Sequence, residues 1–243
     1  ISNEELQTVV SFLLQIQSFI GNKTAKGIKN ASASCFSINQ VLNQIDKRLK
    51  RLTEIFSEIP RLKSFLQNHF IPIYKYRCEI VLEMLSEYDL DKDKELEEYE
   101  LALSPSDFGI HNTLRSPDGK LIFFDFEYFG WDDPVKMVSD AILHPGNSFS
   151  LNSQKLFYNL VRDYYNLRDT NFVRRFQISY PLYALIWCLI ILGNFLPDQW
   201  ERRVFAGEKM SKIEFQSKKL EEAQILLNNL NDLRFSSRIT NNN

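Results

Sequence analysis

The stretch that decides the fold runs from residue 104 to residue 128 and reads SPSDFGIHNTLRSPDGKLIFFDFEY. Within it, Ser116-Pro117-Asp118-Gly119 is a strong turn signal, because proline suits an early turn position and glycine tolerates positive φ. Short extended runs stand on both sides of this turn. We therefore expect a small β-hairpin over residues 112–125.

Outside this stretch, apolar residues recur mostly at helical spacing. The helices that this spacing predicts cover residues 3–21, 38–59, 61–88 (with a bend near Pro72), 135–143, 152–165, 172–195 and 211–230. The segments between them are a connector at 22–37, a charge-dense loop at 89–98, a second extended run at 99–103 and a disordered tail at 235–243. The fold class is therefore mainly α with a small β-hairpin.

Composition excludes several classes of protein. The net charge of −2 and the pI near 6.0 give no sign of bulk electrostatic binding to nucleic acid. Cys35, Cys78 and Cys188 are widely separated and form no C-x-x-C pair. This pattern argues against a disulfide framework or a zinc site, and it fits the reducing cytoplasm, where we expect the protein to reside.

One segment, Tyr180 to Leu196, is apolar enough to be considered as a membrane span. It is marginal in length for a bilayer, with Pro181 near its start and Gly193 and Asn194 near its end. We expect a buried core helix here and no membrane span.

Three polar residues have a spacing that carries chemistry. Asn112 follows Asp107 by five positions, and Asp125 closes the apolar run after the turn. In phosphoryl transfer, one carboxylate orients a hydroxyl, while an asparagine and a second carboxylate supply the oxygen ligands that Mg²⁺ prefers. The alternative is that all three are turn and cap residues of a loop-rich segment.

These residues resemble the aminoglycoside phosphotransferase/choline kinase superfamily, whose members share the protein-kinase-like fold. The family pattern H-x-D-x-x-x-x-N, a hairpin and an I-D-[FW]-E-type motif is similar to PSDFGIHN and FDFEY here, followed by GWDDP and Asp140. The match covers roughly residues 103–145. It implies that residues 1–234 are the helical C-terminal lobe of such a fold, with the catalytic loop and metal hairpin at 103–127.

The resemblance implies roles for four residues. Asp107 would be catalytic, orienting the acceptor hydroxyl, while Asn112 and Asp125 would bind Mg²⁺. Glu127 would assist a second metal ion. ATP would be the phosphoryl donor, and the acceptor would be a small molecule with a hydroxyl group. Asp133, just before Pro134, has an alternative and purely structural role as a helix cap.

The sequence departs from the family pattern at Pro105, which occupies the position of the family's histidine and puts the loop geometry in doubt. His111 lies on the other side of Asp107 and is interpreted as a loop residue, with substrate contact as the alternative. The spelling Asp107-Phe108-Gly109 matches the D-F-G of protein kinases, but it precedes the hairpin instead of following it. We interpret this spelling as accidental.

The half of a kinase that grips ATP is not visible in the sequence. Gly21 and Gly27 are isolated, and no run of strands carries a lysine before residue 100. Because the chain begins with Ile1, we expect it to be a fragment of a longer enzyme, lacking the N-terminal ATP-binding lobe and inactive alone. The alternative is a non-catalytic kinase-like or helical interaction module. The oligomeric state stays open.

A second alternative is calcium binding by the loop DLDKDKELEEYE. The acids Asp89, Asp91, Asp93, Glu97 and Glu100 occupy the ligand positions of an EF-hand loop. However, Lys94 stands where the sharp turn calls for glycine, and no second copy exists to pair with. We therefore expect a solvated charged loop.

Overall fold

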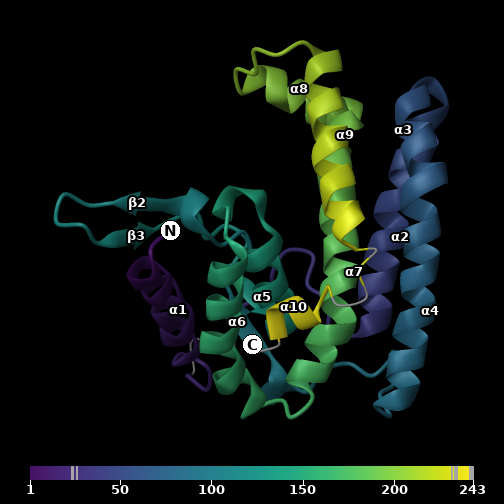
Figure 1. Ribbon diagram of the computed structural model, residues 1–243. Coiled ribbons are helices and arrows are strands. Elements are labelled where there is room, and N and C mark those ends of the chain that lie inside the picture. The colour runs from purple at the N-terminus through teal and green to yellow at the C-terminus, as the bar shows by residue number, and fades with distance from the viewer. Residues whose placement is uncertain (23–24, 26, 231, 233–234, 241–243) are drawn as a thin grey trace. The chain divides into compact units, whose positions relative to one another are not determined.

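The structure, a computed structural model, describes residues 1–22, 25, 27–230, 232 and 235–240 (Figure 1). The chain divides into two compact units. Unit 1 comprises residues 1–38, 92–180 and 236–243, and unit 2 comprises residues 39–91 and 181–235. Helices dominate both units, and the strands among the described residues form only short antiparallel pairs. The predicted class, mainly α with a small β-hairpin, is confirmed.

Unit 1 contains the decisive stretch. Its helices are α1 (Asn3–Gln17), α5 (Pro134–Leu143), α6 (Leu151–Asn166), the first part of α7 (Phe172–Leu192) and α10 (Ser237–Thr240), with short turns η4 (Glu98–Glu100), η5 (Ile110–Asn112) and η6 (Pro145–Asn147). Its strands are β1 (Ala102–Ser104), β2 (Thr113–Arg115), β3 (Leu121–Phe123) and β4 (Gly130–Asp132).

The predicted hairpin is confirmed, and Figure 1 shows it projecting from unit 1 beside α1. β2 and β3 pair antiparallel, with Leu114 opposite Ile122. The turn closes as its sequence predicts, because Gly119 has a φ of 82° and its amide donates to the carbonyl of Ser116 at 2.9 Å.

A second strand pair was not predicted. β1 pairs antiparallel with β4, so the two flanks of the decisive stretch are joined at Leu103 and Trp131. The connector adds to this pair, since the amide of Ala31 donates to the carbonyl of Trp131 at 2.9 Å. Gly130 permits the approach, because a Cβ there would lie 2.4 Å from the carbonyl oxygen of Lys29. Residues 23, 24 and 26 of the connector lie outside the described residues.

Helix α1 has side-chain hydrogen bonds at its start and near its end. A capping box between Ser2 and Glu5 starts it. Near its other end, the buried side chain of Gln17 accepts from the amide of Leu103 at 3.0 Å and donates to the carbonyl of the same residue at 2.8 Å. This amide therefore acts as a strand-like partner for β1 and holds α1 against the strand that leads into the site.

Helix α5 lies in a buried network of charges. Lys136 bridges Asp132 and Asp140 at 2.9 Å each, and the side chain of Asp132 is 0% exposed. Burial raises the pKa of Asp132 to about 6, an effect that Lys136 opposes. Burial also lowers the pKa of Lys136, but the two carboxylates outweigh it and leave that pKa above its usual value. The lysine is therefore charged at neutral pH and neutralises the buried carboxylate of Asp132 and the partly exposed carboxylate of Asp140.

Asp133 has the structural role that was considered for it. Its side chain caps α5 by accepting from the amide of Val135 at 2.8 Å. The guanidinium of Arg175 donates two hydrogen bonds to the same carboxylate, at 2.7 and 3.0 Å, and also contacts Asp169. The two aspartates of the W-D-D-P segment thus serve to hold α5 in place.

Among its described residues, unit 2 consists of helices joined by turns and short loops. It contains α2 (Ile38–Ile55), η2 (Phe56–Glu58), α3 (Pro60–Phe65), the π-turn η3 (Leu66–Phe70), α4 (Ile71–Glu87), the rest of α7, η7 (Gly193–Phe195), α8 (Pro197–Phe205) and α9 (Lys212–Asn229). The predicted bend near Pro72 is found as the π-turn just before it, because proline has no amide to continue the helical hydrogen bonds. The short helix α8 was not predicted.

Helix α7 is apolar and long enough to cross a membrane by length and composition alone. Within residues 172–195, 72% of its apolar 18-residue stretch is buried inside the protein, as expected for a core helix. The three cysteines are free thiols, with Cys35 and Cys188 buried and Cys78 half-buried. Burial raises the pKa of the Cys35 thiol to about 12, so this thiol is unreactive at neutral pH.

The expectation of a disordered tail is wrong for residues 237–240, which form α10. The side chain of Ile239 is 2% exposed, and the hydroxyl of Ser236 donates to the carbonyl of Gln177 at 2.9 Å. These two contacts hold the short polar segment against unit 1. Residues 241–243 lie outside the described residues.

The network around Lys136 generates a stability prediction. We expect Lys136→Met to lower the free energy of unfolding by about 3–5 kcal/mol, because it leaves the carboxylate of Asp132 buried without a counter-charge. Lys120→Met, at the exposed turn of the hairpin, is the control and should change it by less than about 0.5 kcal/mol. Urea unfolding followed by circular dichroism measures both, and equal effects would contradict the assigned role.

Candidate functional site

The loop that carries Asp107 leaves β1 and returns through η5 into the hairpin. Ser106 has a φ of 64°, and the carbonyl of this residue accepts from the amide of Phe108 at 2.6 Å, so the chain turns sharply. Phe108 is buried and stacks on Phe12 of α1 and Phe123 of β3, with centroids 5.7 and 5.3 Å apart. The buried ring of Phe108 therefore anchors the loop, while the carboxylate of Asp107, one position earlier, stays at the surface.

The side chain of Asn147, at the end of η6, holds the same loop from α5. Its Oδ1 accepts from the amide of Ile110 at 2.7 Å, and its Nδ2 donates to the carbonyl of Ala141 at 2.8 Å and to that of Phe108 at 3.4 Å. A Cβ on Gly109 would lie 1.8 Å from that Oδ1. Gly109 is extended, so glycine is needed here for space and not for its backbone conformation.

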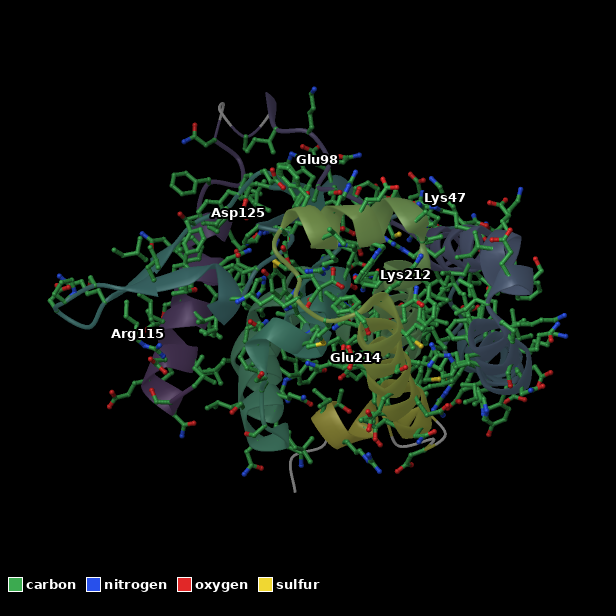
Figure 2. The ribbon with its side chains drawn as sticks, turned by 90° about the horizontal axis from the view of Figure 1, so that it is seen from above. Lys47, Glu98, Arg115, Asp125, Lys212 and Glu214 are labelled. Carbon is green, nitrogen blue, oxygen red and sulfur yellow. The ribbon has the colours of Figure 1, made fainter. Side chains whose placement is uncertain are left out.

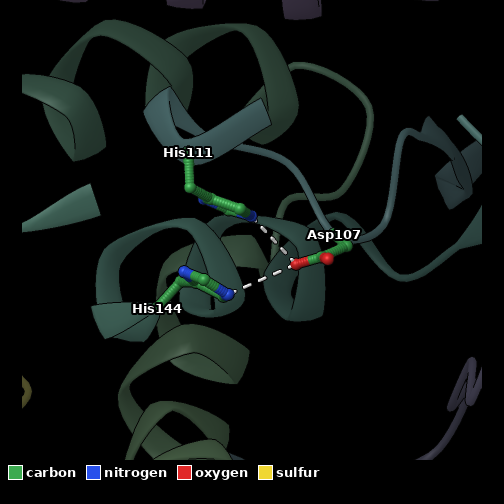
Figure 3. Close-up of side chains that lie close together, drawn as sticks. All are labelled: Asp107, His111 and His144. Atoms are coloured by element: carbon green, nitrogen blue, oxygen red, sulfur yellow. Dashed lines mark hydrogen bonds and ion pairs between the residues drawn. The ribbon is translucent and has the colours of Figure 1, made fainter. Parts of the chain in front are cut away.

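Asp107 lies at the centre of the site, with its side chain 42% exposed. Its Oδ1 is 3.2 Å from Nε2 of His111 and 3.3 Å from Nε2 of His144 (Figure 3). The hydrogen bond from His144 is the main reason why the pKa of Asp107 is lowered; burial acts in the opposite direction. The carboxylate is therefore ionised at neutral pH.

Asp107, His111 and His144 offer ligand atoms within 4.8 Å of one another, close enough for a metal ion. The two imidazoles are stacked, with centroids 3.9 Å apart and planes within 8°, and Nε2 of each ring lies at hydrogen-bond distance from the same oxygen of Asp107. The arrangement suits two hydrogen bonds to one carboxylate.

Asn112 is tied to the same loop. Its side-chain Nδ2 donates to the main-chain carbonyl of Asp107 at 2.8 Å. This bond identifies the nitrogen end of the amide and turns Oδ1 the other way. The main-chain carbonyl of Asn112 accepts from the amide of Phe124 at 3.2 Å, which places the end of β3 beside it.

Asp125 follows directly and is exposed, at the end of the hairpin whose other strand carries Arg115 (Figure 2). It has a φ of 64°, in the left-handed region that aspartate adopts more readily than most other non-glycine residues. Glu127 and Tyr128 are exposed beside it. The pKa of Tyr128 is raised, first by its hydrogen bond to Glu127 and further by the charges of Asp107 and Asp125. The carboxylates thus gather at one surface.

The acids of the 89–100 loop do not form such a group. Among the described residues, the group of three histidine, cysteine or acidic side chains close enough for a metal ion is the one around Asp107. Glu97 and Glu100 instead form a capping box for η4, with the amide of Glu97 donating to Glu100 at 2.8 Å. Two of the five acids thus serve as cap residues, and the solvated charged loop stays a prediction.

Comparisons with known proteins add little to this geometry. No protein-family model matches the sequence, and a search of curated proteins finds no match. Among solved structures, the chain is similar to a choline/ethanolamine kinase family protein from Mesorhizobium loti, with 16% identity and a TM-score of 0.44 over 82% of this chain and 57% of that chain. The chain therefore spans a little over half of that protein's length. Since this TM-score is too low to establish a shared fold, the proposal below rests on the site itself.

Sequence reasoning missed two residues of the site. His144 and Asn147 lie more than thirty positions after Asp107, in the sequence HPGN. Proline and glycine there predict a turn after α5, but this local pattern does not indicate which loop the turn contacts. A search for polar residues at both ends of the helix that follows the W-D-D-P segment would have found them.

The contact between Gly109 and Asn147 generates a coupled prediction. Gly109→Ala should displace the Asn147 side chain and lower the free energy of unfolding by about 1–3 kcal/mol, since buried main-chain groups lose their partners. Gly193→Ala is the matched control, because a Cβ there meets nothing within 4 Å.

The double variant Gly109→Ala/Asn147→Ala tests the cause. If the cost arises through Asn147, the double variant is less destabilised than the sum of the two single variants, by at least about 0.5 kcal/mol. Strict additivity would show that the two residues act independently.

Proposed function

We propose that this chain is the acceptor-binding and metal-binding part of an ATP-dependent phosphotransferase, which transfers a phosphoryl group to a hydroxyl of a small molecule. One observation carries the proposal. The side-chain Nδ2 of Asn112 donates to the main-chain carbonyl of Asp107. The main-chain carbonyl of Asn112 accepts from the amide of Phe124, the residue before Asp125. These two bonds hold Asn112 next to the main chain of Asp107 and of Phe124, the residue before Asp125, and this proximity supports the proposal.

Asp107 orients the acceptor hydroxyl in this proposal. The His144 hydrogen bond lowers its pKa, which makes it a good hydrogen-bond acceptor but a weak base. Phosphoryl transfer through a loose transition state needs little activation of the attacking oxygen, so positioning contributes more than early proton removal. An ionised, half-exposed carboxylate fits this requirement.

Asn112 and Asp125 are the residues that would hold Mg²⁺. Both side chains offer oxygen atoms, the ligand type that this hard cation takes. Asp125 is exposed and Asn112 is half-buried, so the surface beside Asp125 leaves room for the waters and phosphate oxygens that Mg²⁺ retains. When bound, the ion would neutralise charge on the nucleotide phosphates. Glu127 would assist a second ion, although it also accepts a hydrogen bond from Tyr128.

ATP requires further residues in this proposal. The described residues form helices and two short strand pairs, and they do not include a β-rich lobe that could cover a nucleotide. We therefore assign the grip on the ATP phosphates to a separate lobe and expect negligible ATP turnover from residues 1–243 alone. Measurable turnover by this chain would overturn that assignment.

The test is a phosphorylation screen of the protein expressed from its native start codon, against a panel of hydroxyl-bearing metabolites with ATP and Mg²⁺. Asp107→Ala should lower kcat by about 10²–10⁴-fold, because the acceptor hydroxyl loses its orienting carboxylate. Asp125→Asn should raise the Mg²⁺ concentration needed for half-maximal rate.

Asp118→Asn is the matched control, since this carboxylate lies on the same hairpin but pairs with Lys120 at the exposed turn. It should leave both constants unchanged. Full activity of Asp107→Ala would refute the assignment. Binding of a metabolite without phosphorylation of any panel member would favour the non-catalytic binding module.

A further inference from the structure

Two histidines converge on a single oxygen of Asp107. Nε2 of His111 and Nε2 of His144 lie 3.2 and 3.3 Å from Oδ1 (Figure 3). The two side chains come from different places: His111 belongs to η5 in the loop itself, and His144 caps η6 after α5. Such a convergence from separate elements constrains the carboxylate in a way that neither histidine could alone.

The hydrogen bonds around His144 settle which nitrogen carries its proton. The amide of Gly146 donates to Nδ1 of His144 at 3.0 Å, so Nδ1 presents a lone pair. A neutral imidazole with a lone pair on Nδ1 carries its hydrogen on Nε2. The ring therefore donates from Nε2 to Asp107.

His111 follows by a similar argument. Its Nδ1 is buried and has no hydrogen-bond partner among the described residues. With the hydrogen on Nδ1, a buried donor would be unpaired while the Nε2 lone pair faced a carboxylate oxygen. With the hydrogen on Nε2, the donor is satisfied by Asp107. Stacking 3.9 Å from His144 also disfavours two charged rings.

We propose that His111 and His144 are positioning residues, which donate from Nε2 to the same oxygen of Asp107 and leave Oδ2 to accept the hydrogen of the acceptor hydroxyl. This inference rests on the proposed function for the role of Oδ2. Two donors on Oδ1 prevent the carboxylate from rotating, so its second oxygen keeps one direction. The orientation of Oδ2 is then fixed before the substrate binds, so less entropy is lost when the acceptor hydroxyl is aligned.

The first test needs no enzymatic activity. The chain contains three histidines, and His69 belongs to η3 in unit 2. In ¹⁵N-histidine NMR of residues 1–243, we expect His111 and His144 as Nε2–H tautomers with slowly exchanging protons, assigned with His69→Ala. Asp107→Ala should speed exchange of both protons at least about tenfold, because the acceptor of both bonds is gone. A lone pair on Nε2 of either ring, or exchange unaffected by Asp107→Ala, would overturn the proposal.

The second test uses the active protein. His144→Ala should lower kcat by about 10–100-fold with an unchanged KM for ATP, because in this proposal the ring acts through Asp107 and not on the nucleotide. His144→Gln places an amide donor in similar reach and should recover part of kcat. His69→Ala is the control and should match the wild type. Loss of thermal stability with an unchanged kcat in both His111→Ala and His144→Ala would show a purely structural role.

The two tests separate the inference from the proposed function. A wild-type protein that phosphorylates nothing refutes the proposed function and, with it, the role of Oδ2. The NMR result then still decides whether both rings donate to Asp107. A protein that is active but shows the wrong tautomer refutes the inference alone.

Discussion

The carboxamide of Asn147 satisfies three main-chain groups that no other described side chain serves: the amide of Ile110 and the carbonyls of Phe108 and Ala141. Leaving such groups buried and unpaired costs about 1–3 kcal/mol each, so the loop has one favoured position against α5. The directions of Asp107 and Asn112 follow from that position. His144 lies three residues before Asn147, so the turn that clamps the loop also delivers an imidazole to its carboxylate.

The clamp is useful only because α5 is itself immobile. Asp133 caps its first turn, Lys136 joins Asp132 to Asp140, and Arg175 reaches Asp133 from α7. Buried ion pairs are weak sources of net stability, because removing each charge from water costs several kcal/mol. Their effect here is geometric, since paired charges must stay within hydrogen-bond distance. These ion pairs thus hold α5, the helix next to the candidate site, in one position.

Much of this fold is readable from the sequence, because helices and the hairpin are local. Period-3.6 spacing located most helices to within a few residues, and the Pro-Asp-Gly turn located the hairpin. The pairing of β1 with β4 was missed, since nothing in a three-residue strand names a partner some twenty-five residues away. The short helices α8 and α10 were missed because neither has a long apolar face: α8 buries no side chain, and α10 buries only Ile239.

The roles of the candidate site residues stay a prediction, and the residues that support them were not predicted. Asp107, Asn112 and Asp125 follow a spacing that oxygen chemistry explains, and hydrogen bonds hold Asn112 beside the main chain of Asp107 and of Phe124, which precedes Asp125. The D-F-G spelling was interpreted as accidental, and two of its residues have steric reasons here: Phe108 fills an aromatic cluster, and Gly109 makes room for Asn147. His144 and Asn147 stayed hidden because long-range contacts leave no local pattern.

Phe12 has a consequence for how the site responds to events elsewhere in unit 1. Its ring stacks at once on Phe108 of the loop, Phe123 of the hairpin and Phe126 beside the metal-ligand candidates, at 5.7, 4.3 and 5.9 Å. A rotation of α1 therefore cannot occur without repacking all three rings. Closely packed clusters of this kind transmit displacement instead of absorbing it. The helix at the beginning of the chain is thereby mechanically coupled to both halves of the site, and any ligand or domain that shifts it would also shift the spacing between Asp107 and Asp125.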